Sequence, residues 1–178
     1  MQINIPMTTK VEAIAANKLE HIKYTGTQGC YVAVVPKLDY IDRIMRIAEE
    51  LGLSTNAEAL HATVIYSKVA PSSAMATVFD PSMEVTALAN AVEHWTGHNG
   101  KTYIVLKLVS EGIVAENSRF QRMGAKHTFV PFAPHITLSD DTPITEYMTD
   151  VIERINRRFA YKPLDLVFTG QIIGDLED

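Results

Sequence analysis

The chain has 178 residues, 47% of them hydrophobic, so it is long and apolar enough for one domain with a substantial core. Its 16 basic and 21 acidic residues give a formal charge of −5. That charge argues against a broad surface for duplex DNA, but not against one small nucleotide in a local pocket. The only cysteine, Cys30, excludes a disulfide framework and a zinc cluster, and we expect it to be a buried structural thiol.

The N-terminal region differs in pattern from the rest of the chain. Apolar residues at helical spacing over 8–24 predict an amphipathic helix, and a glycine-containing loop follows it. We therefore divide the chain into an N-terminal helical extension, 1–27, and a single domain, 28–178. No apolar run approaches the length of a membrane span, and the N-terminus lacks a signal-peptide pattern. We expect a cytoplasmic protein with no membrane partner.

The main domain alternates extended and helical patterns. In chain order they predict a strand at 30–36, a helix at 41–51, strands at 59–67, 83–95 and 102–110, a helix at 114–126, a strand at 134–139, a helix at 144–159 and a strand at 164–173. The segment 83–95 is compatible with a strand or a helix, and the alternation of Val85, Ala87 and Ala89 favours the strand. This mixture indicates an α+β protein.

Two short segments carry the same pattern, His-x-Thr followed by an aliphatic residue. They are His61-Ala62-Thr63, within HATVIYS, and His135-Ile136-Thr137, within PHITLS. One such match means little in a chain with six histidines. Each match, however, ends the same series of elements: a strand, a helix, and then the strand that carries the motif. The repetition is therefore architectural, and it indicates two related halves.

On a strand, residues i and i+2 point to the same face. Each motif histidine therefore projects together with its threonine. If a pseudo-twofold axis relates the halves, two imidazoles and two hydroxyls surround one small site. The neighbouring apolar residues face the other way and are expected to pack in the core: Ala62, Val64, Ile136 and Leu138.

Such a site suits phosphodiester chemistry without a metal. A neutral imidazole accepts the proton of an attacking hydroxyl, and a protonated one donates to the leaving oxygen. Threonine hydroxyls stabilise the charge that builds on the non-bridging phosphate oxygens. A ribose 2′-hydroxyl is the natural nucleophile, and water then opens the 2′,3′-cyclic phosphate. The sequence does not assign the acid and base roles to the two histidines.

The paired motifs and their duplicated context resemble the 2H phosphoesterase superfamily. The resemblance covers about residues 28–173 and implies a bilobal α+β fold, in which two antiparallel sheets form a central cleft with helices outside. Within the superfamily, GCYVAVVPK before the first motif and HATVIYSK through it are most similar to a phage group, the anti-CBASS nucleases. Those enzymes degrade the cyclic oligonucleotide second messengers of bacterial immunity.

The resemblance implies a hydrolase for 3′–5′ bonds of cyclic di- and trinucleotides such as cyclic GMP–AMP, working in the host cytoplasm with no cofactor and no metal. Its catalytic residues are His61, Thr63, His135 and Thr137. Tyr31 matches a position where an aromatic ring stacks on a base, although strand packing also explains it. We expect a monomer that binds a small cyclic oligonucleotide.

Two other functions remain open from the motifs. An enzyme that opens 2′,3′-cyclic phosphates or trims RNA ends would use the same four residues. The acidic chain favours a small substrate over a long RNA. A binding module could instead sequester a nucleotide without cutting it, but binding alone does not need an acid–base pair.

Several further residues have plainer interpretations. His94 and His98 are spaced as helical metal ligands, but Gly97 would break that helix and no third ligand is evident. We interpret Trp95 as a packing anchor.

His21 and His127 lie at predicted helix ends, where solvent exposure or an interaction with the helix C-terminus explains them. A basic set in the second half could shape a phosphate entrance, but we interpret it as a solvated face: Lys101, Lys107, Arg119, Arg122 and Lys126. Asp175 and Glu177 lie in the region of the family's C-terminal substrate contacts, and we interpret them as surface carboxylates.

Overall fold

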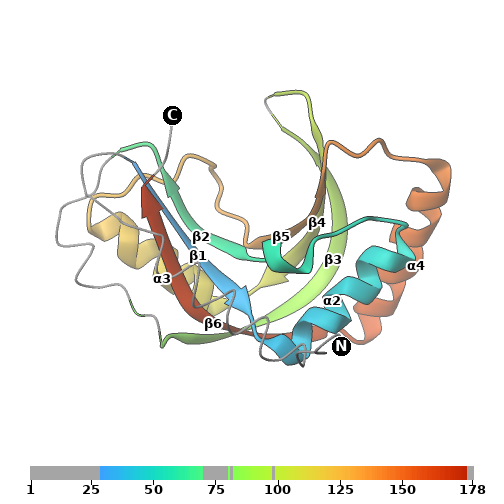
Figure 1. Ribbon diagram of the computed structural model, residues 1–178, viewed down its shortest axis with the longest axis horizontal. Coiled ribbons are helices and arrows are strands. Elements are labelled where there is room, and N and C mark those ends of the chain that lie inside the picture. Colours follow the sequence, from blue (N-terminus) through green and yellow to red (C-terminus); the bar gives the residue numbers. More distant parts are fainter. Residues whose placement is uncertain (1–28, 70–79, 81, 98, 176–178) are drawn as a thin grey trace, which may run out of the picture.

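The computed structural model describes residues 29–69, 80, 82–97 and 99–175 (Figure 1). The helix predicted over 8–24 and most of the 68–82 connection lie outside these residues. In the described part, no helix is both long and apolar enough to cross a membrane. The elements are β1 (Cys30–Pro36), α2 (Leu38–Glu50), η1 (Ala57–Ala59), β2 (Ala62–Ser67), β3 (Glu84–Thr96), β4 (Thr102–Val109), α3 (Glu111–Arg122), β5 (His135–Asp140), α4 (Glu146–Tyr161) and β6 (Leu164–Asp175).

The predicted α+β class is confirmed, and the ambiguous segment over 83–95 is a strand, β3. The expected pair of sheets is corrected: the six strands form one closed antiparallel order, β1-β2-β5-β4-β3-β6. The reason is that the strands also meet at β2 and β5, through a single residue pair, Ala62 with Ile136, while β3 pairs with β6 on the other side. In Figure 1 the strands curve around the β2–β5 junction, and the concave side opens upward.

The repeated unit is confirmed as β1–α2–β2 in the first half and β4–α3–β5 in the second. The strand that follows each unit crosses to the other half, since β3 pairs with β4 and β6 pairs with β1. β3 and β6 also pair with each other, which closes the sheet. This exchange was not expected, because periodicity reports which side of a strand is buried and not its partner.

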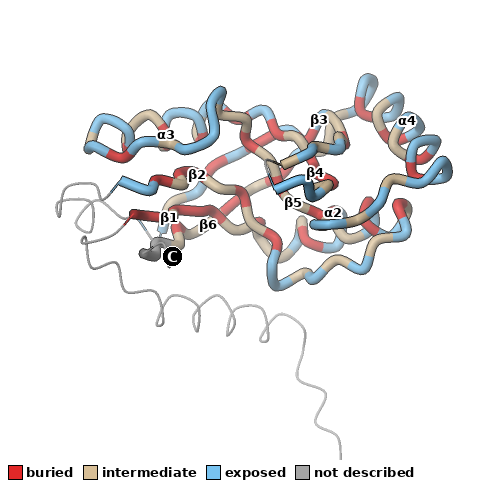
Figure 2. The backbone as a smooth tube through the Cα atoms, turned by 90° about the horizontal axis from the view of Figure 1, so that it is seen from above, coloured by how far each residue is buried: buried red, intermediate tan, exposed pale blue. Residues whose placement is uncertain are grey.

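The helices lie on the outside of the sheet, each buried on one side and exposed on the other (Figure 2). The helix α3 begins earlier than its apolar periodicity suggests, and α4 begins later, because a capping side chain sets the start of each helix. Ser110 accepts a hydrogen bond from the Ile113 N–H, and Thr145 accepts one from the Met148 N–H. The predicted end of α2 near Gly52 is confirmed, with Gly52 at φ 71°.

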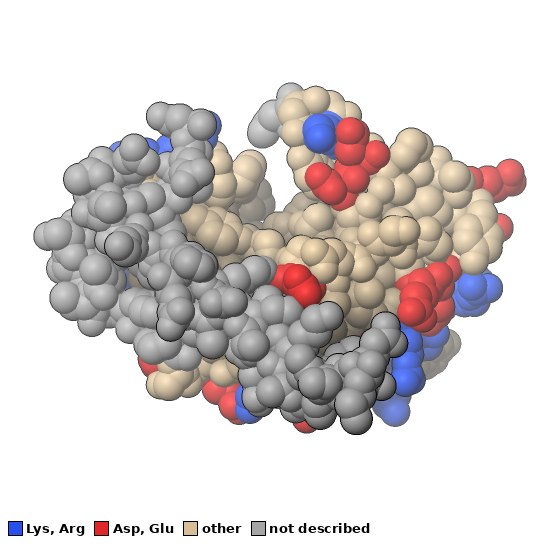
Figure 3. Space-filling view, viewed as in Figure 1, with Lys and Arg blue, Asp and Glu red and all other residues tan. Residues whose placement is uncertain are grey.

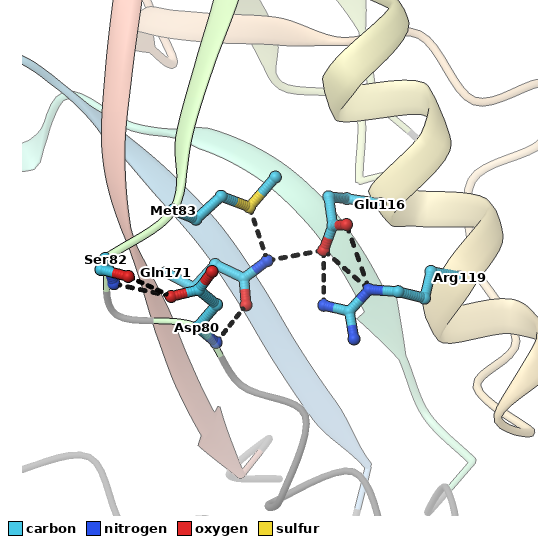
Figure 4. Close-up of polar contacts among 6 residues, drawn as sticks. All are labelled: Asp80, Ser82, Met83, Glu116, Arg119 and Gln171. Carbon is cyan, nitrogen blue, oxygen red and sulfur yellow. Dashed lines mark hydrogen bonds and ion pairs between the residues drawn. The ribbon is translucent and has the colours of Figure 1, made fainter.

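A buried polar network fastens α3 to β6 (Figure 4). Gln171 is fully buried. Its amide nitrogen donates to Glu116 at 2.7 Å, and its oxygen accepts from the Asp80 N–H at 3.0 Å. Glu116 in turn binds Arg119, one turn along α3. The network satisfies a buried amide within the protein, and it lies on the side of the sheet where α3 packs.

Candidate active site

The two motifs meet at the β2–β5 junction. Because Ala62 lies opposite Ile136 in an antiparallel pair, extending the register by one residue places His61 opposite Thr137 and Thr63 opposite His135. Ala62 and Ile136 are both fully buried, whereas the four motif side chains are partly exposed. The predicted alternation is therefore confirmed. We call the side of the sheet that carries these four side chains the cleft face.

The cleft face lies below a hollow in the molecular surface. In the space-filling view, the surface is hollowed between the two halves at the top of the picture (Figure 3). The strands β2 and β5 lie in the middle of the curved sheet beneath it (Figure 1).

Both histidines are held in the same way. The Nδ1–H of His61 donates to the Ala59 carbonyl at 2.7 Å, and the Nδ1–H of His135 donates to the Ala133 carbonyl at 2.8 Å. A carbonyl can only accept, so the hydrogen lies on Nδ1 in both rings. Proton exchange is therefore left to Nε2 in each histidine.

A β-bulge follows each motif threonine. In β2 the extra residue is Val64, between the residues that pair with Ala33 and Val32; in β5 it is Leu138. A bulge leaves backbone groups without ladder partners. The Val64 carbonyl accepts from Asn117 of α3 at 2.7 Å, and the Leu138 carbonyl accepts from Thr55 at 2.8 Å. Each bulge is therefore fastened by a side chain from the other half.

Tyr31 lies beside the first motif. Its hydroxyl is 3.2 Å from Thr63 Oγ1, and its ring meets the His61 ring edge-on, with centroids 5.8 Å apart. Burial raises the pKa of Tyr31 to about 12, although the hydrogen bond to Thr63 opposes this. The bulge at Val64 also turns Tyr66 to this side, 6.3 Å from the Tyr31 ring. Plain alternation would have placed Ile65 there.

The surroundings of His135 were not foreseen. The ring of Trp95 packs against it, with centroids 4.5 Å apart, so Trp95 lies on the cleft face. Trp95 is thus a packing residue, as expected, but its packing partner is a motif histidine. Lys107 is the direct cross-strand partner of His135, which corrects its assignment to a solvated basic face. Burial lowers the pKa of His135, partly opposed by its bond to the Ala133 carbonyl.

His127 also differs from its helix-end interpretation. It lies past the end of α3, in an isolated bridge with Ser67, and its Nδ1 accepts a hydrogen bond from the Tyr66 N–H. Burial lowers the pKa of His127, and repulsion from the charge on His135 lowers it further. The two rings are thus near enough for the protonation of one to disfavour that of the other.

The remaining candidates do not join the site. His94 lies exposed on β3, so the helical spacing with His98 does not arise. Arg119 pairs with Glu116, and Lys101 with Asp141. Cys30 is fully buried, as expected. The residues outside the described part, or whose side chains are not described, are His21, His98, Asp175 and Glu177.

Comparison with known proteins identifies the family that this site belongs to. The family model of anti-CBASS protein Acb1 matches residues 28–165. The chain is 27% identical over 150 residues to an anti-CBASS protein Acb1 of Vibrio phage KVP40, covering 81% of this chain and 93% of the relative. It is 31% identical over 133 residues to the Acb1 of Enterobacteria phage T4, covering 69% and 79%. A third relative, from Yersinia phage phiR1-RT, is 30% identical over 124 residues, covering 68% and 78%.

Proposed function

The chain belongs to the anti-CBASS protein Acb1 family, and from this premise we propose that it is a metal-independent phosphodiesterase for cyclic di- and trinucleotide second messengers. The observation that carries the proposal is the β2–β5 register, which brings two H-x-T segments onto one face. Cleavage of a messenger such as cyclic GMP–AMP in the host cytoplasm would remove the signal for CBASS immunity.

The proposed first step is an internal transfer. The 2′-oxygen of a ribose attacks the adjacent 3′-phosphorus while one imidazole accepts the 2′-hydroxyl proton. The bond from phosphorus to the 5′-oxygen breaks, and the other imidazole gives that oxygen a proton. The ring opens to a linear product with a 2′,3′-cyclic phosphate and a 5′-hydroxyl. Water then opens the cyclic phosphate, with the two histidines in exchanged roles.

We assign the base of the first step to His135. Burial favours its neutral form, which is the form that accepts a proton. His61 then donates to the leaving oxygen. The equal Nδ1 bonds support this exchange of protons at Nε2 in both rings. The hydroxyls of Thr63 and Thr137, each opposite a motif histidine, donate to the non-bridging oxygens in the transition state.

Tyr31 has a supporting role in this proposal. Its ring is partly exposed and lies against His61, and its high pKa keeps the hydroxyl protonated at neutral pH. A base next to the cleaved bond would stack on this ring, as bases do on aromatic side chains in sites for single-stranded nucleic acids.

The substrate class is tested by mass spectrometry after incubation with a chelator. The substrates are cyclic dinucleotides, cyclic trinucleotides, a 2′,3′-cyclic mononucleotide and a short RNA. We expect linear products with a terminal phosphate from the cyclic oligonucleotides. Opening of only the mononucleotide or the RNA end would favour the RNA-processing function. Recovery of a bound but intact cyclic dinucleotide after long incubation would favour sequestration.

A further inference from the structure

Lys107 stands out among the residues of the sheet. The chain has 16 lysines and arginines, yet Lys107 is the only one within the six strands that the structure describes. Its neighbours along β4, Leu106 and Leu108, are buried. A single cation therefore interrupts an apolar strand, and strands generally disfavour lysine.

This cation lies on the cleft face beside the motif. Lys107 is paired directly with His135 across β4 and β5, so the two side chains project to the same side. The register places Thr63 on the other side of His135. The motif histidine is thus flanked in one row by a hydroxyl and by an ammonium-bearing side chain.

The ammonium is held by an acidic residue of β3. Lys107 Nζ donates to Glu93 Oε1 at 3.0 Å, and Trp95 Nε1–H donates to Glu93 Oε2 at 2.8 Å. Burial raises the pKa of Glu93, but these two hydrogen bonds and the Lys107 charge outweigh it, so the carboxyl stays ionised. Trp95 in turn packs on His135. The ion pair and the motif therefore form one contiguous group.

Stability does not account for this arrangement. The side chains of Lys107 and Glu93 are 42% and 35% exposed, and pairs of that exposure contribute little to folding. A phosphodiester, by contrast, gains negative charge on its non-bridging oxygens during transfer, and a nearby ammonium favours that change.

We propose that Lys107 binds the phosphate that is cleaved, and that Glu93 is its partner in the resting protein. The proposal rests on the proposed function and adds a phosphate-binding residue outside the two motifs. When phosphate binds, the ammonium hydrogen bonds pass from the Glu93 carboxylate to a non-bridging oxygen. Glu93 then competes with the substrate for Lys107, and its removal should strengthen anion binding.

The test uses inorganic phosphate as the probe, with the full chain, and follows the His135 imidazole signals by NMR. Phosphate should shift these signals in the wild type. Lys107→Gln should weaken the apparent affinity about tenfold or more, the loss typical of a charge-assisted hydrogen bond, and Lys107→Arg should restore most of it. Glu93→Gln, which keeps an acceptor for Trp95, should strengthen the affinity. A merely structural role would weaken binding in both Gln variants.

Lys37→Gln is the matched control. Lys37 is 41% exposed and also pairs with a glutamate of β3, Glu84, but it follows β1 and lies outside the H-x-T rows. The Lys37→Gln variant should bind phosphate with the affinity of the wild type. The proposal is overturned if the wild type shows no response, if Lys107→Gln matches the wild type, or if Glu93→Gln weakens binding. Failure of the proposed function would be seen separately, as no cleavage of any nucleotide in the substrate panel.

Discussion

At the residue scale, each motif histidine donates a hydrogen bond to the backbone carbonyl two residues before it, but the two rings have different neighbours. His61 lies against Tyr31, whereas His135 lies against Trp95 and beside Lys107. A ring beside a cation and an indole loses hydration, which disfavours its protonated form. The two histidines therefore have different surroundings, which is what the proposed acid and base roles require.

These roles predict opposite responses to a changed leaving group. In a cyclic dinucleotide whose 5′-oxygen is replaced by sulfur at one linkage, the leaving thiolate needs no proton. The His61→Ala variant should then recover most of its lost rate, because the missing acid is no longer required. The His135→Ala variant should stay inactive, because the 2′-hydroxyl still needs a base. Rapid-quench rates check this, and recovery by His135→Ala instead would reverse the assignment.

Tyr31 allows its ring and its hydroxyl to be tested separately. Tyr31→Phe keeps the ring and removes the hydrogen bond to Thr63, so we expect nearly unchanged KM. Tyr31→Ala should raise KM about tenfold, in line with the loss of one stacked base. Steady-state kinetics on cyclic GMP–AMP measure both. Equal effects of the two substitutions would mean that the hydroxyl, and not stacking, is what matters.

At the scale of elements, the bulges set the motif geometry, and side chains from the opposite half set the bulges. Asn117 is 2% exposed and holds the Val64 carbonyl. Asn117→Ala leaves that buried acceptor unsatisfied, so we expect a loss of about 1–3 kcal/mol in the free energy of unfolding. Because Val64 follows Thr63 directly, kcat should fall as well. Thr55→Val removes the hydrogen bond to the Leu138 carbonyl, so it should also lower both stability and kcat.

Asn156→Ala is the matched control for this prediction. Asn156 of α4 also binds strand backbone, accepting from the Val92 N–H at 2.7 Å and donating to its carbonyl at 2.9 Å. Val92 lies on β3, two strands from the motif of β5, and it belongs to neither bulge that follows a motif threonine. Asn156→Ala should therefore lower stability with little change in kcat under folded conditions. Equal losses of kcat in Asn117→Ala and Asn156→Ala would show that the bulge caps have no special role.

Most elements could be predicted from the sequence because their burial patterns are local. Alternation along β2 and β5 identifies the outward faces of both motifs, and the duplicated order of elements pairs them. The cross-strand neighbours could not be predicted in this way. Lys107 and Trp95 reach His135 only through the pairing of β3, β4 and β5. The bulge at Val64, which brings Tyr66 to the cleft face, likewise has no local signal in an apolar run.

At the scale of the whole molecule, the pKa shifts couple folding to pH. The pKa values of His127 and His135 lie below 6.5 in the folded state, so the unfolded chain binds more protons near that pH. Stability is then fully present above pH 6.5 and falls as the pH drops through the folded pKa values. Between pH 7.5 and 5.5 we expect the free energy of unfolding to decrease, by at most about 1.4 kcal/mol per pH unit for each histidine.

Denaturant unfolding at several pH values measures this slope. A double variant, His127→Gln/His135→Gln, should show a shallower decrease, since it removes both groups while amides can keep the backbone hydrogen bonds. A slope equal to that of the wild type in the double variant would refute the linkage.

The central claim is that the two H-x-T motifs act together on one phosphodiester. The most direct measurement is the single-turnover rate of cyclic GMP–AMP cleavage, with chelator present, for the wild type, His61→Ala, His135→Ala and the double variant. We predict cleavage by the wild type to a linear 2′,3′-cyclic phosphate, and a loss in each single variant nearly as large as in the double variant. Cleavage by the folded double variant at the wild-type rate would contradict the account.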